Sequence, residues 1–266
     1  MQARSALFDV FGDYLRQRGG RAPVAALVRL LAPLDVSPPA VRTAISRMVR
    51  QGWLAPGRLA SGPGYQLTER AVRRLDDTAA RVYRVGPASW DGLFDLLVID
   101  MPADRTERHR VSSTLGFLGY GSLDNGVWVA PRPSAEVASV LAGLAYERFT
   151  ATRAGGTAGA LDLVRRAWDL KKIGEEYGQF VRDLRPTVLA VTGRSADVQA
   201  YAARVRLVHA WRAFLFTDPG LPAVLLPARW PGTAAAAFFD RHQARLRAAA
   251  DRFVDQCLDP QTWKDR

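Results

Sequence analysis

Residues 34–53 have the sequence LDVSPPAVRTAISRMVRQGW. This stretch contains the signals that begin and end one helix, and its apolar residues recur at helical spacing. Ser37 is a favourable N-cap, and Pro38 at the first helical position loses only a backbone N–H that would lack a partner there. Gly52 stands where a helix commonly ends on a left-handed residue. The apolar residues between these signals recur at helical spacing and predict one buried stripe: Val41, Ala44, Ile45, Met48 and Val49.

The opposite face of this helix is polar and basic. Arginine can bind guanine through two hydrogen bonds, and hydroxyl groups can reach phosphates and base edges. The face therefore predicts a helix that reads DNA, although an ordinary amphipathic helix with solvated arginines would show the same pattern. The predicted DNA-binding residues of this helix are Arg42, Thr43, Ser46, Arg47 and Arg50.

The flanking segments favour the DNA-binding interpretation. Residues 4–16 have apolar residues at helical spacing, and a second short helix begins after Pro23. Residues 55–67 read as a hairpin with Gly, Pro and Ser at its tip and with Arg58 beside it, and Thr68 caps a further helix. Three short helices followed by a hairpin predict a winged helix-turn-helix domain over residues 1–87.

The distribution of charge agrees with this interpretation. Residues 1–90 contain 14 Arg and no Lys against 6 acidic residues, a net charge of +8. The remaining 176 residues contribute only +3 of the total of +11, from 23 basic and 20 acidic residues. Positive charge concentrated in the segment with the helix-turn-helix pattern is typical of a domain that binds double-stranded DNA.

The composition also limits the class of protein. One cysteine, Cys257, permits no internal disulfide and excludes a thiolate metal cluster. The chain has no apolar run long enough for a membrane span and no apolar segment of a secretory signal. We expect a cytoplasmic protein that does not associate with membranes.

Residues 88–155 predict a second, smaller domain. A dense apolar run over residues 94–101 is typical of a buried strand, and an Asn-Gly turn leads into another strand. The predicted order is a strand (94–101), a helix (105–118), a strand (to 131), a helix (134–144) and a strand (146–153). This order predicts a ferredoxin-like α+β module.

The rest of the chain is predicted to be a helical C-terminal domain, residues 156–266. Residues 154–159 read as a flexible junction, and helices are predicted over residues 161–184, 207–216 and 233–258. The expected fold class is therefore α+β and mainly helical.

Several segments, in order along nearly the whole chain, resemble the PaaX-type transcriptional regulators, repressors of aromatic-acid (phenylacetate) catabolism. They are FGDY (11–14), VRTAISRM (41–48), QGWL (51–54), YQLT (65–68), WRAFLFTDP (211–219) and LLPARWPG (225–232). The resemblance implies a repressor that leaves its operator when an aryl-CoA thioester such as phenylacetyl-CoA binds, without a cofactor. A homodimer is expected, because one recognition helix reads only a few base pairs.

Tryptophan and arginine residues of the C-terminal domain could hold the aromatic acyl group and the CoA phosphates of such an effector. They could equally be core residues. The candidate effector-binding residues are Trp168, His209, Trp211, Arg212 and Trp230.

Two enzymatic alternatives remain. Small ferredoxin-like nucleases of CRISPR systems carry an acidic residue at the end of their first strand, where Asp100 falls, although no second carboxylate with metal-ligand spacing accompanies it. The alternative to a nuclease is that Asp100 simply ends the strand. A CoA-thioester enzyme would need a reaction centre, and no Gly-rich phosphate loop, GxSxG motif or Cys/His pair is present. We therefore predict no catalytic residue and no metal site.

Overall fold

The computed structural model describes residues 1–59, 62–82, 90–124, 126–193 and 195–259. The chain folds into two compact units. The first unit contains Met1–Val85, Phe180–Arg212 and Ala235–Arg266, and the second contains Gly86–Gln179 and Ala213–Ala234. Each unit encloses a hydrophobic core of its own. The expected fold class, α+β and mainly helical, is confirmed.

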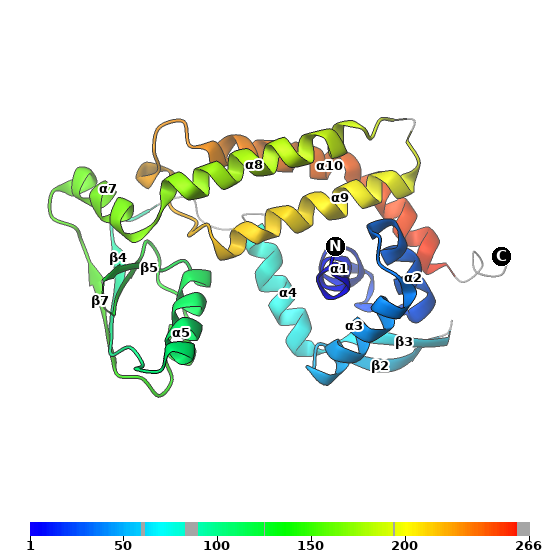
Figure 1. The fold of residues 1–266 in the computed structure, drawn as a ribbon, viewed down its shortest axis with the longest axis horizontal. Helices are drawn as coiled ribbons and strands as arrows, with labels where there is room; N and C mark the ends of the chain where they lie inside the picture. Colours follow the sequence, from blue (N-terminus) through cyan, green and yellow to red (C-terminus); the bar gives the residue numbers. More distant parts are fainter. Residues whose placement is uncertain (60–61, 83–89, 125, 194, 260–266) are drawn as a thin grey trace. The chain divides into compact units, whose positions relative to one another are not determined.

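The N-terminal part of the first unit follows the predicted order of short helices, hairpin and longer helix (Figure 1). Its elements are α1 (Ala3–Val10), a π-helical turn (Phe11–Leu15), a 3-10 turn (Arg16–Arg18), β1 (Arg21–Pro23), α2 (Val24–Leu31), a 3-10 turn (Ala32–Leu34), α3 (Pro38–Arg50), β2 (Leu54–Leu59), β3 (Gly62–Leu67) and α4 (Glu69–Val82). The predicted first helix is therefore not one regular α-helix, because its second half widens into a π turn.

A three-stranded antiparallel sheet closes this part of the unit in the order β1-β3-β2. In the hairpin, Leu54 pairs with Leu67 and Leu59 pairs with Gly62. Gly64 allows the close approach of β1, since a Cβ atom there would lie 2.8 Å from the carbonyl oxygen of Ala22. The tip of the hairpin, residues 60–61, lies outside the described residues.

Helices from the C-terminal half complete the core of the first unit. They are α9 (Asp197–Arg212), most of α10 (Pro231–Leu258) and the end of α8 (Leu170–Leu189). Figure 1 shows α9 passing beside α1, and the two helices are in contact. Apolar side chains of α9 and α10 share one core with α1 and α3: Tyr201, Val205, Ala250 and Val254. Packing thus joins half of the predicted C-terminal domain to the N-terminal segment.

The second unit is built on a four-stranded antiparallel sheet in the order β5-β6-β4-β7. Its elements are β4 (Phe94–Ile99), α5 (Arg105–Phe117), β5 (Gly121–Asp124), β6 (Val127–Ala130), α6 (Val137–Val140), β7 (Tyr146–Ala151), α7 (Gly156–Ala167) and 3-10 turns at Ala213–Phe216 and Ala223–Leu225. One face of β4 packs on α5 and α6, and the other packs on α7.

Three predicted elements of this region are corrected. The helix predicted over 134–144 shrinks to α6. The helix predicted over 161–184 is two helices, because Trp168 is extended and Asp169 caps α8 by accepting a hydrogen bond from the Lys172 N–H at 2.9 Å. The junction predicted at 154–159 is instead largely the first turn of α7, which begins at Gly156.

In the described part of the chain, no single helix is long and apolar enough to cross a membrane. Residues 24–34 and α3 pass that test of length and composition only when they are counted together across a bend of 119°.

Candidate nucleic-acid interface

The helix α3 separates its residues into a buried and an exposed face, as its sequence predicts. Four of the five predicted stripe residues are buried in the core of the first unit: Val41, Ala44, Ile45 and Met48. The predicted DNA-binding residues of α3 are all exposed: Arg42, Thr43, Ser46, Arg47 and Arg50. The helix contributes three arginines and no acidic residue to this surface.

Local sequence holds both ends of α3. Ser37 is the N-cap residue by its extended backbone, although its side chain makes no capping hydrogen bond, and Pro38 begins the helix. Gly52 has the predicted left-handed conformation, with φ of 71°. The chain then turns back, and the Trp53 N–H donates to the carbonyl oxygen of Met48 at 2.9 Å. The Trp53 ring packs edge-on against Phe8 of α1, with ring centroids 5.2 Å apart.

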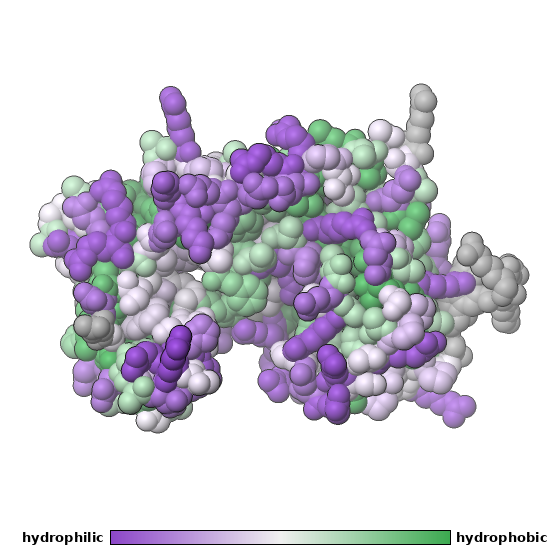
Figure 2. Space-filling model, viewed as in Figure 1, coloured by the Kyte–Doolittle hydropathy of each residue, from purple (hydrophilic) through white to green (hydrophobic). Residues whose placement is uncertain are grey.

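The exposed arginines are available to bind a ligand. Within the described residues, the side chains of Arg42, Arg47 and Arg50 make no hydrogen bond or ion pair, and neither does Arg58 on β2. Arg58 is exposed at the end of the hairpin close to its tip. Figure 2 shows hydrophilic side chains over the surface where α3 and the hairpin lie. An unpaired, basic, acid-free helix face attracts phosphate and offers donors to base edges.

Three predicted effector residues lie on α9 in the first unit. His209 Nδ1 lies 2.6 Å from Oδ2 of Asp9, and Arg212 pairs with the other carboxylate oxygen of Asp9. Trp211 is buried, stacks on Phe239 at 4.7 Å and donates its indole N–H to the Val82 carbonyl oxygen at 3.1 Å. These contacts give all three residues structural partners.

The other two predicted effector residues belong to the second unit. Trp168 is buried in the core between the sheet and α7. Trp230 contacts Tyr177 edge-on, with ring centroids 6.0 Å apart. Neither unit by itself brings all five residues together.

A small crevice with a cavity volume of about 20 Å³ lies between α4, α9 and the π turn of the first unit. Leu75 and Val82 line it from α4, and Val208 and Arg212 line it from α9. Drug-sized ligands occupy pockets of roughly 300–1,000 Å³. The crevice therefore has room for about one water molecule and is far too small for a CoA thioester.

Asp100 follows β4 and is exposed. Its backbone N–H donates to the Ala145 carbonyl oxygen at 3.0 Å. Among the residues that the structure describes, no group of three or more His, Cys, Asp or Glu side chains could hold a metal ion. The buried carboxylate of β4 is Asp95, which accepts hydrogen bonds from Arg148 (Nε to Oδ1, 2.8 Å) and from the Tyr120 hydroxyl.

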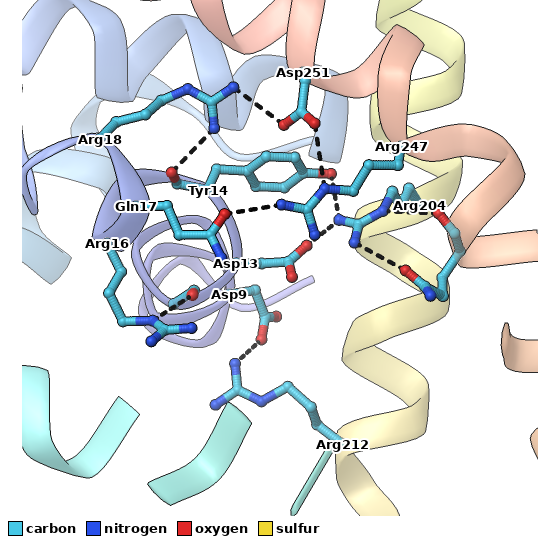
Figure 3. A network of polar contacts seen from close by, with 12 residues as sticks. Asp9, Asp13, Tyr14, Arg16, Gln17, Arg18, Arg204, Arg212, Arg247 and Asp251 are labelled. Atoms are coloured by element: carbon cyan, nitrogen blue, oxygen red, sulfur yellow. Dashed lines mark hydrogen bonds and ion pairs between the residues drawn. The ribbon is translucent and has the colours of Figure 1, made fainter. Parts of the chain in front are cut away.

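A polar network that the sequence pattern does not predict joins α9 and α10 to the first helices (Figure 3). Arg204 of α9 is fully buried, pairs with Asp13 and donates to the Tyr14 hydroxyl oxygen at 2.9 Å. Its Nε donates to the carbonyl oxygen of Gln243 on α10 at 3.1 Å. Burial raises the pKa of Tyr14 far above its ordinary value, so the phenol stays protonated. The sequence signal of this network is the presence of arginines, Arg204 and Arg206, inside an apolar segment of α9.

Two further arginines extend the network at the surface. Arg18 donates to Asp255 at 2.8 Å and to Asp251 at 3.1 Å, both on α10. Arg247 donates to Asp251 at 3.2 Å and to Gln17 at 3.0 Å. The exposed helix α3 thus belongs to a unit that is built from both the N-terminal and the C-terminal parts of the chain.

Three family models match successive parts of the chain. A model described as PaaX-like protein matches residues 2–71, one described as PaaX protein central Cas2-like domain matches residues 87–161, and one described as PaaX-like protein C-terminal domain matches residues 168–256.

A curated relative and a solved structure are similar over nearly the same length. The Transcriptional repressor PaaX of Escherichia coli (strain K12) is 28% identical over 262 residues, which cover 95% of this chain and 83% of that protein. The solved structure of the uncharacterized protein Rv0674 from Mycobacterium tuberculosis has a TM-score of 0.63 and 24% identity, covering 95% of this chain and 98% of that chain. The structural likeness shows a shared fold.

Proposed function

Because the chain belongs to the PaaX family of regulators, we propose that it is a DNA-binding transcriptional repressor of aromatic-acid catabolism of the phenylacetate type. The observation that carries the proposal is the exposed face of α3, which holds three arginines without partners in the described structure and no acidic residue. The similar Escherichia coli protein is named a transcriptional repressor. We expect the protein to act in the cytoplasm, where its operator would be.

In this proposal, residues 1–87 form a winged helix-turn-helix domain. The helix α3 would be the recognition helix and would enter the major groove. The preceding helix α2 would be the first helix of the helix-turn-helix, and the β2–β3 hairpin would be the wing. Arg42, Thr43, Ser46, Arg47 and Arg50 would meet base edges and phosphates, and Arg58 would contact a phosphate from the wing. The order of helices and hairpin supports this assignment.

The second unit would hold a ferredoxin-like module. Its order of strands and helices, β-α-β-β-α-β, and its antiparallel sheet support this assignment for residues 88–155. A role in catalysis is not part of the proposal, because the nuclease alternative at Asp100 gains no support from the described residues, in which no group of three or more His, Cys, Asp or Glu side chains could hold a metal ion. The alternative of a CoA-thioester enzyme gains no support from the crevice, because its Thr78 hydroxyl donates to the Arg74 carbonyl oxygen at 2.7 Å and its Asp13 carboxylate pairs with Arg204.

The effector in this proposal is an aryl-CoA thioester such as phenylacetyl-CoA, and no cofactor is required. The protein would have one conformation that binds DNA and one that does not. For the effector to release DNA, its affinity for the second conformation must be higher than its affinity for the first. His209, Trp211 and Arg212 would act from α9, and Trp168 and Trp230 from the second unit. Since Trp168 and Trp211 are buried in cores, their contribution would require a local rearrangement.

We propose that the protein works as a homodimer. One α3 helix covers only a few base pairs, and two copies on adjacent half-sites multiply the specificity.

The test is fluorescence anisotropy of labelled DNA from upstream of the protein's own coding sequence, against scrambled DNA of equal length. We expect specific binding with a steep dependence on salt, reversed by phenylacetyl-CoA but not by free CoA or phenylacetate. Specific binding that ignores the thioester would refute the effector and keep the repressor. Equal affinity for both DNAs would refute the repressor.

A further inference from the structure

The turn that leads into α3 has an unfavourable backbone conformation. Asp35, between the 3-10 turn at Ala32–Leu34 and α3, has φ of 62° although it is not a glycine. Its N–H donates to the Ala32 carbonyl oxygen at 3.1 Å, and the Val36 N–H reaches the Leu31 carbonyl oxygen at 3.4 Å. A non-glycine residue in this region persists only where surrounding contacts hold it.

One of those contacts comes from α9, 171 positions later in the chain. Nη2 of Arg206 donates to the Asp35 carboxylate at 3.0 Å and to the carbonyl oxygen of Pro33 at 3.3 Å. A single guanidinium nitrogen therefore contacts both the backbone and the side chain of the turn. The turn and α9 are also in contact along their backbones.

The base of Arg206 is itself fixed. Two residues before it, Arg204 is buried and bonded to Asp13 and Tyr14. Three residues after it, His209 meets Asp9. Contacts on both sides thus hold this stretch of α9 to α1 and the π turn, so Arg206 approaches the turn from a rigid support.

A change of angle at this turn would be amplified along α3. Arg47 lies nine residues after Pro38, which is about 13 Å along the helix axis. A change of about 10° at the turn would move Arg47 by roughly 2 Å, whereas hydrogen-bond lengths vary by only about 0.5 Å. A small loss of order at Asp35 would therefore disturb base contacts far along the helix.

We propose that Arg206 is a positioning residue for operator binding, which sets the direction of α3 through its hydrogen bonds to Asp35 and Pro33. This inference rests on the proposed DNA-binding function. The same helix α9 carries the candidate effector residues His209 and Arg212, so an effector that shifts α9 would act on α3 through this pair.

The pair is accessible enough to be altered without unfolding the protein. The side chain of Arg206 is 40% exposed and that of Asp35 is 84% exposed. Ion pairs this exposed contribute little to stability. A change in DNA affinity would therefore report on the position of α3 rather than on folding.

The experiment compares the full-length wild type with Arg206→Met, Asp35→Asn and the double variant, on upstream DNA and on scrambled DNA, with a salt titration. Methionine keeps the aliphatic stem of Arg206, and asparagine tolerates the positive φ of position 35. Arg252→Met is the matched control, because Arg252 makes an exposed ion pair with Asp197 at 2.7 Å in the same unit but away from the turn.

Asp35→Asn gives the sharpest readout. Removing a negative charge near DNA would by charge alone strengthen binding to any DNA, whereas loss of positioning weakens binding to the operator. We expect Arg206→Met to lose about tenfold in affinity for upstream DNA, the equivalent of roughly one base contact. Asp35→Asn should lose less, because its amide oxygen can still accept a hydrogen bond from Arg206. The double variant should lose no more than Arg206→Met alone, and the salt slope should not change.

Three outcomes would overturn the inference: unchanged affinity for upstream DNA, a loss matched by Arg252→Met, or a loss equal on both DNAs. In the last case a salt slope smaller by about one would assign Arg206 to a direct phosphate contact instead. If the wild type itself shows no preference for upstream DNA, the proposed function fails and the inference fails with it.

Discussion

Arg204 on α9 donates a hydrogen bond to the hydroxyl oxygen of Tyr14 at 2.9 Å, although 190 positions separate the two residues in the chain. The arginine is fully buried, and its guanidinium also lies over the Tyr14 ring, 5.2 Å from the centroid. Asp13 and the Gln243 carbonyl oxygen accept further hydrogen bonds from the Arg204 guanidinium. The unit that contains α3, the helix proposed to bind DNA, is therefore completed by residues from the last third of the chain.

Replacement of Arg204 by methionine should destabilise the protein by about 3–5 kcal/mol, because the ion pair of this fully buried guanidinium with Asp13 would be lost. Urea unfolding measures the change. The double variant Arg204→Met with Asp13→Leu should recover part of the loss, since both charges of the ion pair are then removed together. A loss below about 1 kcal/mol for the single variant would contradict the burial of this ion pair.

Arg47→Ala should weaken binding to the operator by about 1–3 kcal/mol and leave the fold intact, since Arg47 is exposed and makes no described contact. Anisotropy measures the affinity, and circular dichroism monitors the fold. Arg165→Ala is the matched control, because Arg165 is an exposed arginine of α7. Unchanged operator affinity with a native spectrum would remove Arg47 from the interface.

Ile45→Asp should unfold the N-terminal part of the first unit, because Ile45 is 2% exposed and the carboxylate would be buried without a partner. Thermal unfolding followed by circular dichroism checks this. The neighbouring Ser46→Asp provides the control, as it places the same charge on the exposed face. That variant should fold normally and still lose DNA affinity through repulsion of phosphate. A stable Ile45→Asp protein would show that α3 is rotated from the position described.

Cys257 should react slowly with thiol reagents in the native protein. Burial raises the pKa of this thiol to about 11 from an ordinary 9.0, which lowers the reactive thiolate fraction at pH 8 about a hundredfold. Alkylation by iodoacetamide, followed by mass spectrometry, gives the rate. The same protein in urea is the control and should react quickly. Equal rates in both solutions would mean that Cys257 is accessible in the native state.

His242 should make the protein less stable in mild acid. Burial, followed by the charges of Arg245, Arg241 and Arg185, lowers its pKa below the ordinary 6.5. The unfolded chain then binds a proton more readily than the folded one, so the free energy of unfolding is highest above pH 6.5 and declines as pH falls below it. Urea unfolding between pH 8 and pH 5 should show a shallower decline for His242→Gln than for the wild type. An identical decline for both proteins would exclude this role of His242.

Much of the candidate interface follows from local sequence. The period of the apolar residues and the Pro38 and Gly52 signals determine α3, and they also determine which face of it is exposed. These features are set by contacts between residues three or four apart, so they can be predicted without the rest of the chain. The prediction of one helix over 161–184 was wrong, because the chain is extended at Trp168 and divides this segment into two helices. The spacing of apolar residues does not show where a helix is interrupted.

The sequence by itself determined the mainly helical α+β fold class, the basic exposed face of α3 and the resemblance to one family of regulators. Only the tertiary structure decided that α9 and α10 belong to the same unit as the N-terminal helices. It also decided that Arg204 donates a hydrogen bond to Tyr14 and that Arg206 donates one to Asp35. The physical reason is the range of the interactions. Helix period and end signals act within a few residues, whereas burial of an ion pair depends on which surfaces meet after the chain has folded.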